Sequence, residues 1–302
     1  MAGIRETLEV GGARLRGAGS ESPRLDAELL LGHVVGLERT SILAHPEAPL
    51  SDGQLERFRA LVERRAAGEP VAYIRGVKEF YGLALAVDPR ALIPRPETES
   101  LVELALARVR GALSAAPRPA GTRPFRVLDV GTGSGAVVVA LARTLGRAGY
   151  GEAVRFTASD RSQDALALAV ENAVSHGVAD LIDFRVADLL DPAIEVDGPI
   201  DLVVANLPYI PSAVLPELPV AASFEPREAL DGGPDGLDLV RRLLVDLPRV
   251  LVAGGGALLE IGADQGETAV AAAAERLPGW PATIHPDLAG QPRVLSVERP
   301  GR

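Results

Sequence analysis

The feature that most constrains this chain is a glycine-rich turn between a predicted strand and a predicted helix, in residues 126–142 (RVLDVGTGSGAVVVALA). Val127 and Leu128 begin a short apolar run that predicts a buried strand, and Asp129 follows it. Three glycines at alternate positions come next, ahead of an apolar run long enough for a packed helix. Glycine has no Cβ and adopts unusual backbone angles, and a helix N-terminus offers free N–H groups to an anion. The stretch therefore predicts a site at which the backbone closely approaches a nucleotide-like ligand.

The glycine spacing leaves two cofactors to compare. Gly131, Gly133 and Ala136 satisfy the relaxed dinucleotide fingerprint, so the glycines alone permit NAD. Asp129 would accept from an ammonium group or a bound water near the loop, and Asp160, after the next apolar run, is placed to bind ribose hydroxyls. The tighter D-x-G-x-G-x-G spacing resembles the first motif of class I S-adenosylmethionine (SAM) methyltransferases. SAM is therefore favoured over NAD, and over a glycine turn that binds nothing.

Composition restricts the class of protein. A length of 302 residues allows two domains, and 47% hydrophobic with 24% charged residues is ordinary for a globular chain. The chain has no cysteine, which excludes disulfides, thiolate metal sites and thiol catalysis. We expect a cytoplasmic protein without a membrane partner, because we find neither a signal-peptide pattern nor an apolar stretch of the roughly 20 residues that a span needs.

Charge and histidine spacing restrict the partners. The net charge is −10, carried almost entirely by residues 91–302. An acidic catalytic half is a poor match for a polyanion, so we expect no direct nucleic-acid partner. The histidines, at positions 33, 45, 176 and 285, lie far apart without ligand spacing, so no metal site is predicted.

The hydrophobic pattern divides the chain into three parts. Residues 1–69 are predicted to form a helical N-terminal domain, with Pro23 in a first helical turn and Ser51 beginning another helix. On pattern alone this domain is either a packing cap or a substrate-recognition module. Residues 70–95 alternate like a β-hairpin linker, and residues 96–302 form the cofactor-binding domain.

The third part alternates strands with helices, which predicts an α/β fold with parallel βαβ units and helices on both faces of a Rossmann-like sheet. A helix is predicted from Glu97 to about Leu113, followed by a loop at 114–124. A closing antiparallel pair of strands is predicted at 282–285 and 293–297. The predicted strands are 126–130, 154–159, 181–186, 200–205 and 256–261, and the predicted helices are 135–146, 162–175, 236–252 and 264–276.

A second motif, Asn206-Leu207-Pro208-Tyr209, follows the predicted strand 200–205. It would lie at the carboxyl end of the sheet, where open α/β sheets bind ligands. The Asn206 side-chain oxygen and the Leu207 carbonyl could each accept one N–H of a planar amino or amide group, with Tyr209 stacked on it. Methyl transfer from a sulfonium has a neutral leaving group, so positioning and electrostatics can carry much of the rate. The alternative is a strand-end turn that Asn206 caps and Pro208 stiffens.

Two charged residues in the segment FEPRE, Glu225 and Arg227, remain to be interpreted. They could form a structural ion pair or shape a loop over the target. The structural role is favoured, because ion pairs of this kind are common on protein surfaces.

Taken with these motifs, the chain is similar to the release factor glutamine N5-methyltransferases, a family that methylates the glutamine of the Gly-Gly-Gln loop in class 1 peptide-chain release factors. The match runs nearly end to end. It includes the segments PVAYIRGVKEFYG, LIPRPETE, LDVGTGSGA, NLPYIP, FEPREALDGGPDGLDL, LLEIGADQG and DLAGQPRV.

The resemblance implies a role for each matching residue. Asp160 would bind the ribose, Asp188 and Leu189 would lie beside the adenine, and Asn206 to Tyr209 would hold the target glutamine, with Asn206 also near the cofactor. The helical N-terminal domain would help to dock the release factor. The further SAM contacts that the family implies are Gly131, Thr132, Gly133, Ser134 and Gly135.

Two departures from the family pattern concern the substrate and the adenine. Leu207 stands where the family usually has proline, and Leu189 stands where relatives often have an aromatic residue. Asn-Leu-Pro-Tyr also occurs in adenine N6-methyltransferases, so methylation of RNA or DNA adenine stays an alternative, as does a ribosomal-protein glutamine. A non-catalytic SAM-binding or assembly protein is disfavoured, because both motifs are intact.

Overall fold

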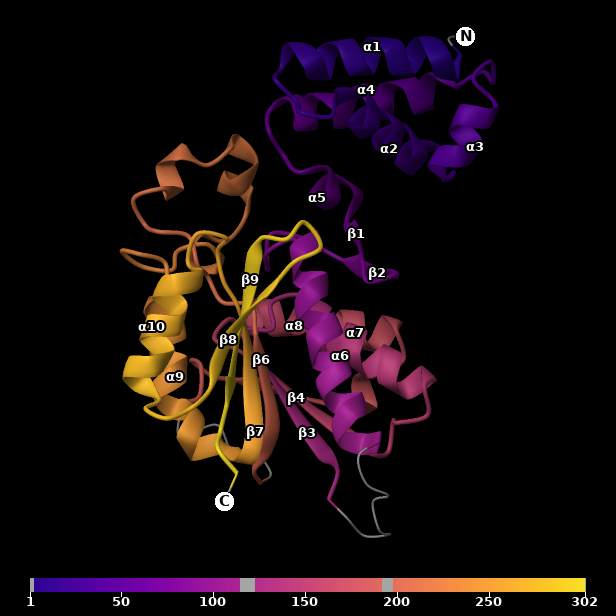
Figure 1. Ribbon diagram of the computed structural model, residues 1–302. Coiled ribbons are helices and arrows are strands. Elements are labelled where there is room, and N and C mark those ends of the chain that lie inside the picture. Colours follow the sequence, from indigo (N-terminus) through magenta and orange to yellow (C-terminus); the bar gives the residue numbers. More distant parts are fainter. Residues whose placement is uncertain (1–2, 115–122, 192–197, 302) are drawn as a thin grey trace. The chain divides into compact units, whose positions relative to one another are not determined.

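The computed structural model describes residues 3–114, 123–191 and 198–301. These residues form two compact units (Figure 1). The first unit comprises the chain as far as Val77 together with Leu218–Phe224, and the second runs from Lys78 to Glu217 and from Glu225 onward. None of the helices in the described ranges is long and apolar enough to cross a membrane.

The first unit is helical, as predicted. Ser51 begins α4 in a capping box, in which its hydroxyl accepts from the Gln54 N–H and the Gln54 side chain accepts from the Ser51 N–H. Gly11 lets α1 approach α4 closely, because a Cβ at this position would lie 2.5 Å from the ring of Phe58. The helices are α1 (Ile4–Gly17), α2 (Pro23–Val35), α3 (Arg39–Ala44), α4 (Asp52–Ala66) and α5 (Val71–Arg75).

The β-hairpin after α5 is shorter than the sequence pattern predicted. The β-structure expected from residue 70 onward is confined to β1 (Val77–Phe80) and β2 (Leu83–Ala86), because residues 71–75 form a helix. A five-residue helix is too short to establish a 3.6-residue apolar period, so alternation was the stronger signal. Tyr81 and Gly82 both have positive φ angles, 50° and 70°, which a tight two-residue hairpin turn requires.

The second unit is built on a seven-stranded sheet of order β5-β4-β3-β6-β7-β9-β8. The strands from β5 to β7 run parallel, and β9 is antiparallel to both β7 and β8. The chain order reverses between β3 and β6, and ligands bind at such a switch point in open sheets. The strands are β3 (Phe125–Val130), β4 (Val154–Asp160), β5 (Ile182–Val186), β6 (Ile200–Ala205), β7 (Leu251–Glu260), β8 (Ala282–Pro286) and β9 (Pro292–Glu298).

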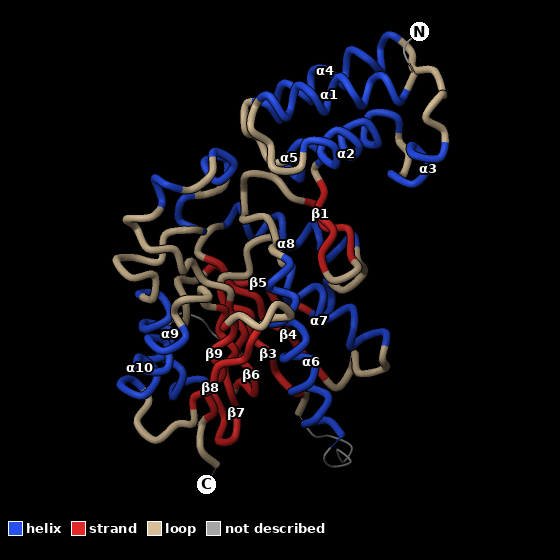
Figure 2. The backbone as a smooth tube through the Cα atoms, turned by 45° about the horizontal axis from the view of Figure 1, so that its top comes forward, coloured by secondary structure: helices blue, strands red, loops and turns tan. Residues whose placement is uncertain are grey.

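Helices cover both faces of this sheet (Figures 1 and 2). One face carries α6 (Glu99–Ser114), α7 (Ala136–Arg147) and α8 (Gln163–Ser175), and the other carries α9 (Asp238–Val250) and α10 (Gly266–Arg276). Side chains of β3 alternate between the two cores: Val127 packs in the first and Leu128 in the second. The predicted α/β class with a class I methyltransferase sheet is therefore confirmed.

The element bounds differ from the prediction mainly around β7. The helix predicted at 236–252 ends at Val250, and the strand predicted from 256 begins at Leu251, which pairs with Ile200 of β6. Leu251, Val252 and Ala253 continue the apolar run of the helix before them, and three consecutive glycines, which are unfavourable inside a strand, separate them from the predicted strand. A register shift also occurs along this pairing. Of the loop predicted at 114–124, residues 115–122 lie outside the described residues.

Candidate active site

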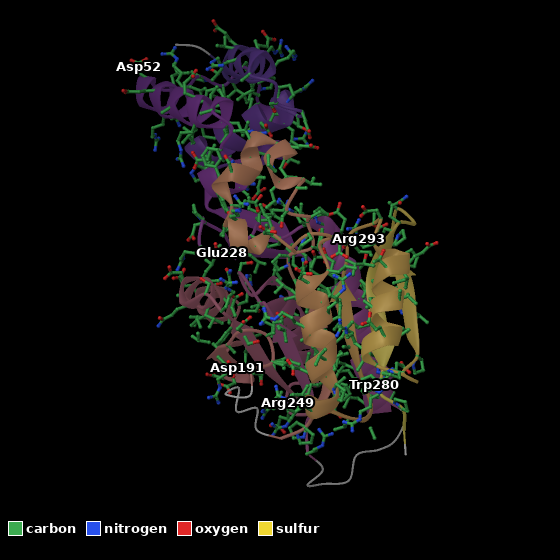
Figure 3. The ribbon with its side chains drawn as sticks, turned by 90° about the vertical axis from the view of Figure 1, so that its left-hand side faces the viewer. Asp52, Asp191, Glu228, Arg249, Trp280 and Arg293 are labelled. Carbon is green, nitrogen blue, oxygen red and sulfur yellow. The ribbon has the colours of Figure 1, made fainter. Side chains whose placement is uncertain are left out.

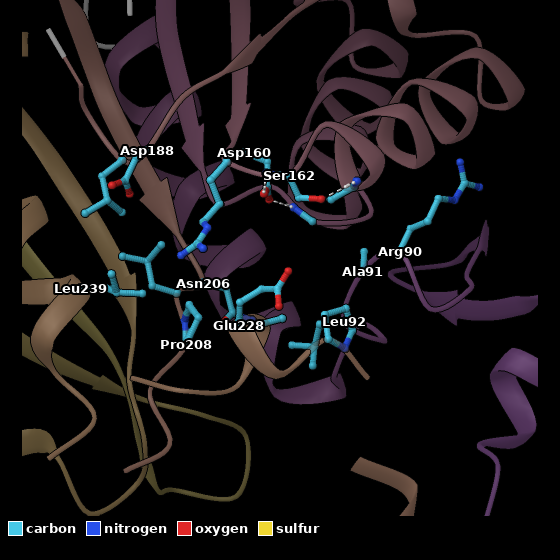
Figure 4. A pocket seen from close by; sticks show the side chains of 18 of the residues that line it. Arg90, Ala91, Leu92, Asp160, Ser162, Asp188, Asn206, Pro208, Glu228 and Leu239 are labelled. Atoms are coloured by element: carbon cyan, nitrogen blue, oxygen red, sulfur yellow. Dashed lines mark hydrogen bonds between the residues drawn. The ribbon is translucent and has the colours of Figure 1, made fainter. Parts of the chain in front are cut away.

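A pocket opens at the carboxyl ends of β3, β4, β5 and β6, at the switch point of the sheet (Figure 4). Figure 4 shows Asp160, Asn206 and Glu228 around a common space, whereas the guanidinium of Arg90 points away from it. Figure 3 shows Glu228 and Arg293 at this end of the sheet and Arg249 and Trp280 at the other.

The glycine loop after β3 forms one wall of the pocket. Gly131, Gly133 and Gly135 have φ angles of 70°, 55° and 79°, a left-handed region that glycine enters freely. A Cβ at Gly131 would lie 2.9 Å from the side chain of Leu207, whereas a Cβ at Gly133 meets nothing closer than 4.0 Å. Gly131 thus lets the two predicted motifs meet, and Gly133 leaves backbone exposed to a ligand.

Asp129 supports this loop from beneath instead of lining the pocket. Asp129 is only 1% exposed, and its Oδ2 accepts a hydrogen bond from the Thr132 hydroxyl at 2.7 Å. Burial raises the pKa of this carboxyl to about 7. The sequence predicted that Asp129 would accept from a ligand's ammonium group or from a bound water near the loop; in the structure its carboxyl is buried under the turn and is not among the residues that line the pocket.

Asp160 lines the pocket, at the end of β4. Its Oδ2 accepts from the Gly133 N–H and its Oδ1 from the Ser162 N–H, each at 2.9 Å. Burial raises its pKa, although these N–H groups act in the opposite direction. A carboxylate oxygen has two lone pairs, so each oxygen can still accept a hydroxyl from the pocket.

The segment after β5 contributes Asp188 and Leu189, as the resemblance implied. Leu189 is buried with a φ angle of 53°, a conformation that costs a non-glycine residue on the order of 1 kcal/mol. The Asp188 carboxylate pairs with Arg242 at 2.7 Å, and both side chains are about half exposed. The surrounding structure therefore holds Leu189 in a strained position at the pocket wall, next to a charged rim.

The second motif brings Asn206, Leu207 and Pro208 into the same pocket. Asn206 Nδ2 donates to Thr98 Oγ1 at 3.0 Å, which leaves the amide oxygen available. The Tyr209 backbone carbonyl accepts a hydrogen bond from Gln265 Nε2 at 2.8 Å. Burial raises the pKa of the Tyr209 hydroxyl to about 12. The described pocket lining does not include Tyr209, so a stacking role for it stays a prediction.

Three predicted cofactor residues lie in the loop but not among the pocket-lining residues. Thr132 and Ser134 are buried, and Gly135 is the N-cap residue of α7. The Thr132 hydroxyl donates to Asp129, and the Ser134 carbonyl accepts from Asn172 Nδ2 at 2.9 Å. These residues shape the loop from behind, and direct ligand contacts at them stay a prediction.

Two further segments line the pocket that residue-by-residue reasoning missed. Leu92 begins the family segment LIPRPETE, which Arg90 and Ala91 precede, and the residues from Pro226 to Leu239 belong to FEPREALDGGPDGLDL; neither segment carries a recognisable catalytic pattern. The residues concerned are Arg90, Ala91, Leu92, Pro226, Glu228 and Ala229, with Leu239 from α9.

Glu225 joins these two segments. Its carboxylate accepts from the Ile93 N–H at 3.1 Å and from Arg95 at 2.5 Å, with only 3% of its side chain exposed. The predicted structural role is therefore present, but the partner was wrong: Arg227 lies 3.8 Å from Asp231 instead. The short 3-10 turn at Arg227 turns that side chain outward, where it is 77% exposed.

Comparisons with known proteins agree along the whole chain. A family model of the PrmC N-terminal domain matches residues 6–76, and one of a methyltransferase domain matches residues 122–276. The release factor glutamine methyltransferase of Moorella thermoacetica is 41% identical over 297 residues, covering 98% of both chains. That of Deinococcus radiodurans is 39% identical over 298 residues, covering 99% of both. The hMettl16 catalytic domain, solved with a MAT2A 3'UTR hairpin, shares the fold, with TM-score 0.55, 15% identity, and coverage of 85% of this chain and 84% of that chain.

Proposed function

The chain belongs to the release factor glutamine methyltransferase family, and from this premise we propose that it transfers a methyl group from SAM to the side-chain amide nitrogen of the glutamine in the Gly-Gly-Gln loop of class 1 release factors. The observation that carries the proposal is the meeting of the glycine loop and Asn206–Pro208 in one pocket. We place this reaction in the cytoplasm, where release factors act.

The residues of the pocket fit SAM. The Cβ-free backbone of Gly133 provides a cradle, and Asp160 has free lone pairs for two vicinal hydroxyls. Leu189 and Leu239 supply an apolar wall for the adenine ring, and Asp188 lies beside it. The lining carries the carboxylates of Asp160 and Glu228 together with the guanidinium of Arg161, so it presents charges of both signs to a ligand that itself carries both. When bound, SAM supplies an electrophilic methyl group on a sulfonium sulfur.

The substrate amide would be held by two acceptors. Asn206 Oδ1 and the Leu207 carbonyl each accept one N–H of the glutamine side chain, so both hydrogens are engaged in the plane of the amide. The nitrogen lone pair, perpendicular to that plane, is then directed at the methyl carbon. Such an arrangement would fix the attack geometry without a dedicated catalytic base: as the N–C bond forms, the methyl–sulfur bond would break to leave a neutral thioether, and one of the two amide protons would leave to solvent. Leu207 keeps the carbonyl that the role requires, in place of the family's usual proline.

We further propose that the helical first unit helps to dock the release factor. The match to the PrmC N-terminal domain supports this role over that of a packing cap. A glutamine-bearing loop is a small target, so a second binding surface would provide affinity and selectivity.

The proposal is tested by incubating the purified protein with methyl-labelled SAM and three acceptors. These are class 1 release factors, the same factors with the loop glutamine changed to alanine, and total RNA. We expect label on the release factor that disappears with the glutamine change. Label on RNA alone would contradict the proposal and make Leu207 the mark of an adenine methyltransferase, and label on a ribosomal protein alone would redirect it to another glutamine.

A further inference from the structure

Glu260 is a buried acidic residue that the reaction proposed above does not use. It ends β7, next to the strand that delivers Asn206, because Ala205 of β6 pairs with Leu259 of β7 in the parallel register. The residue has an exposed fraction of 0%, and neither carboxyl oxygen has a hydrogen-bond partner among the described residues. An unsatisfied buried polar group costs about 1–3 kcal/mol, so its presence requires an explanation.

The groups around Glu260 are two hydroxyls, one guanidinium and one further carboxylate. The hydroxyls of Thr98 and Tyr209 and the guanidinium of Arg293 face it closely enough to lower its pKa, and Glu97 acts in the opposite direction. Arg293 is bound elsewhere, to Asp287 and to a backbone carbonyl, each at 3.3 Å. Burial outweighs these groups and raises the pKa of Glu260 to about 7. The carboxyl is therefore an acceptor whose nearest neutral donors are hydroxyl groups.

Thr98 connects this carboxyl to the reactive pocket. It is 3% exposed, and its Oγ1 accepts from Asn206 Nδ2 at 3.0 Å. A threonine hydroxyl has one proton to donate. With Oγ1 already accepting from the amide, that proton needs another acceptor, and the unpartnered carboxyl of Glu260 faces it.

The direction of this proton decides which end of the Asn206 amide faces the substrate. The oxygen and nitrogen of an asparagine side chain are nearly equal in size, so only hydrogen bonding distinguishes the two orientations. If the Thr98 proton were free, it could donate to Asn206 Oδ1, and the amide would turn its N–H groups toward the substrate. An N–H group of Asn206 would then face an N–H group of the substrate amide, so no hydrogen bond would hold that amide.

We propose that Thr98 and Glu260 are positioning residues, which consume the hydroxyl proton of Thr98 and so keep the Asn206 side-chain oxygen turned toward the amide to be methylated. This inference rests on the proposed function, since it assigns Asn206 the role of acceptor for that amide. It predicts that the acceptor capacity at position 260 matters, and that its negative charge does not.

The test compares variants that remove or retain each polar atom. Thr98→Val and Glu260→Met remove the hydroxyl and the acceptor, while Thr98→Ser and Glu260→Gln retain them. Release factor methylation gives kcat and KM, calorimetry gives the SAM Kd, and Thr283→Val, on the exposed face of β8, is the matched control. We expect kcat to fall 10- to 100-fold in Thr98→Val and Glu260→Met. In Thr98→Ser and Glu260→Gln, kcat should stay within fivefold of the wild-type value. The SAM Kd should change less than twofold in all four variants.

The two removals should also fail to add. A double variant, Thr98→Val with Glu260→Met, is expected to be no slower than the worse single variant, because both act through one amide. Wild-type kcat in Thr98→Val, or equal loss in Glu260→Gln and Glu260→Met, would overturn the inference. So would a loss of SAM binding parallel to the loss of rate, which would indicate general damage. Failure of the proposed function would be recognised separately, because the wild-type protein would then label no release factor.

Discussion

The Asn206 side chain presents an oxygen to the pocket because its nitrogen is already engaged by Thr98 Oγ1, 3.0 Å away. At the scale of single residues, the pocket is lined by three residues with acceptor groups, Asn206, Leu207 and Asp160, which we propose as the acceptors for the amide and the ribose. None of them needs to change protonation for methyl transfer. The buried carboxyl of Asp129 accepts from Thr132 beneath the glycine loop, and we propose that the buried carboxyl of Glu260 acts on Asn206 through Thr98.

Replacing Asn206 tests the acceptor role most directly. In Asn206→Ala we expect kcat for release factor methylation to fall on the order of 100-fold or more, as for loss of a donor or acceptor at a reacting group. The SAM Kd should rise less than about fivefold, because the glycine loop and Asp160 remain. Initial-rate kinetics with calorimetry will separate the two effects. A kcat within threefold of wild type would remove Asn206 from the reaction.

The raised pKa of Glu260 has a consequence for stability. Its folded-state pKa of about 7 lies above the ordinary glutamate value, so the folded protein keeps a proton that the unfolded chain releases. The contribution to the free energy of unfolding is complete below about pH 4 and is lost as the pH rises through 7. In Glu260→Gln the decline of this free energy between pH 5 and 7 should be shallower than in wild type, by at most about 1.4 kcal/mol per pH unit. Urea unfolding at several pH values measures the slope, and identical slopes in the two proteins would contradict the prediction.

At the scale of elements, the glycine loop joins β3 to α7 and fits against the turn that follows β6. Its shape depends on left-handed glycines and on the contact between Gly131 and Leu207. The ion pair between Glu225 and Arg95 adds a second connection at the same end of the sheet, between two segments 130 residues apart. Several loops therefore form the pocket, and direct contacts between side chains or between a side chain and backbone hold each loop in place.

Gly131→Ala should disturb this loop beyond the cost of backbone strain. The new Cβ would lie 2.9 Å from the Leu207 side chain, and the alanine would have to adopt the φ angle of 70° that the glycine has. We expect at least a tenfold rise in the SAM Kd, measured by calorimetry. Gly149→Ala is the matched control, since Gly149 also has a positive φ angle, 84°, but a Cβ there meets nothing within 4 Å. Equal SAM affinity in the two variants would show that the close approach to Leu207 is unimportant.

At the scale of the whole molecule, the chain combines a helical unit with a separate α/β unit that contains the entire pocket described above. The net charge of −10 opposes association with nucleic acid, and we propose that the first unit serves protein recognition. Substrate affinity and cofactor affinity should therefore respond to different substitutions.

Gly11→Ala should separate these two affinities. Its Cβ would lie 2.5 Å from the ring of Phe58, forcing α1 away from α4 at a cost of about 1–3 kcal/mol. We expect faster amide hydrogen exchange in both helices and a raised KM for the release factor, with an unchanged SAM Kd. Gly53→Ala, where a Cβ meets nothing within 4 Å, is the control. An unchanged KM despite faster exchange would count against docking by the first unit.

The sequence by itself determined the fold class, the two motifs and most element positions. These features depend on local signals: apolar periodicity, the glycines at 131, 133 and 135, and the proline at 208. Where local signals were weak the prediction failed, as for helix α5, with five residues, and for the early part of β7, with three consecutive glycines.

Only the tertiary structure decided which distant side chains meet. Glu225 pairs with Arg95 and not with Arg227, and Asn206 bonds to Thr98 across 108 positions. The parallel pairing of β6 with β7 places Glu260 beside Asn206. No local pattern encodes such pairs, because the partners are chosen by strand order and register, which arise from packing the whole sheet between its helices.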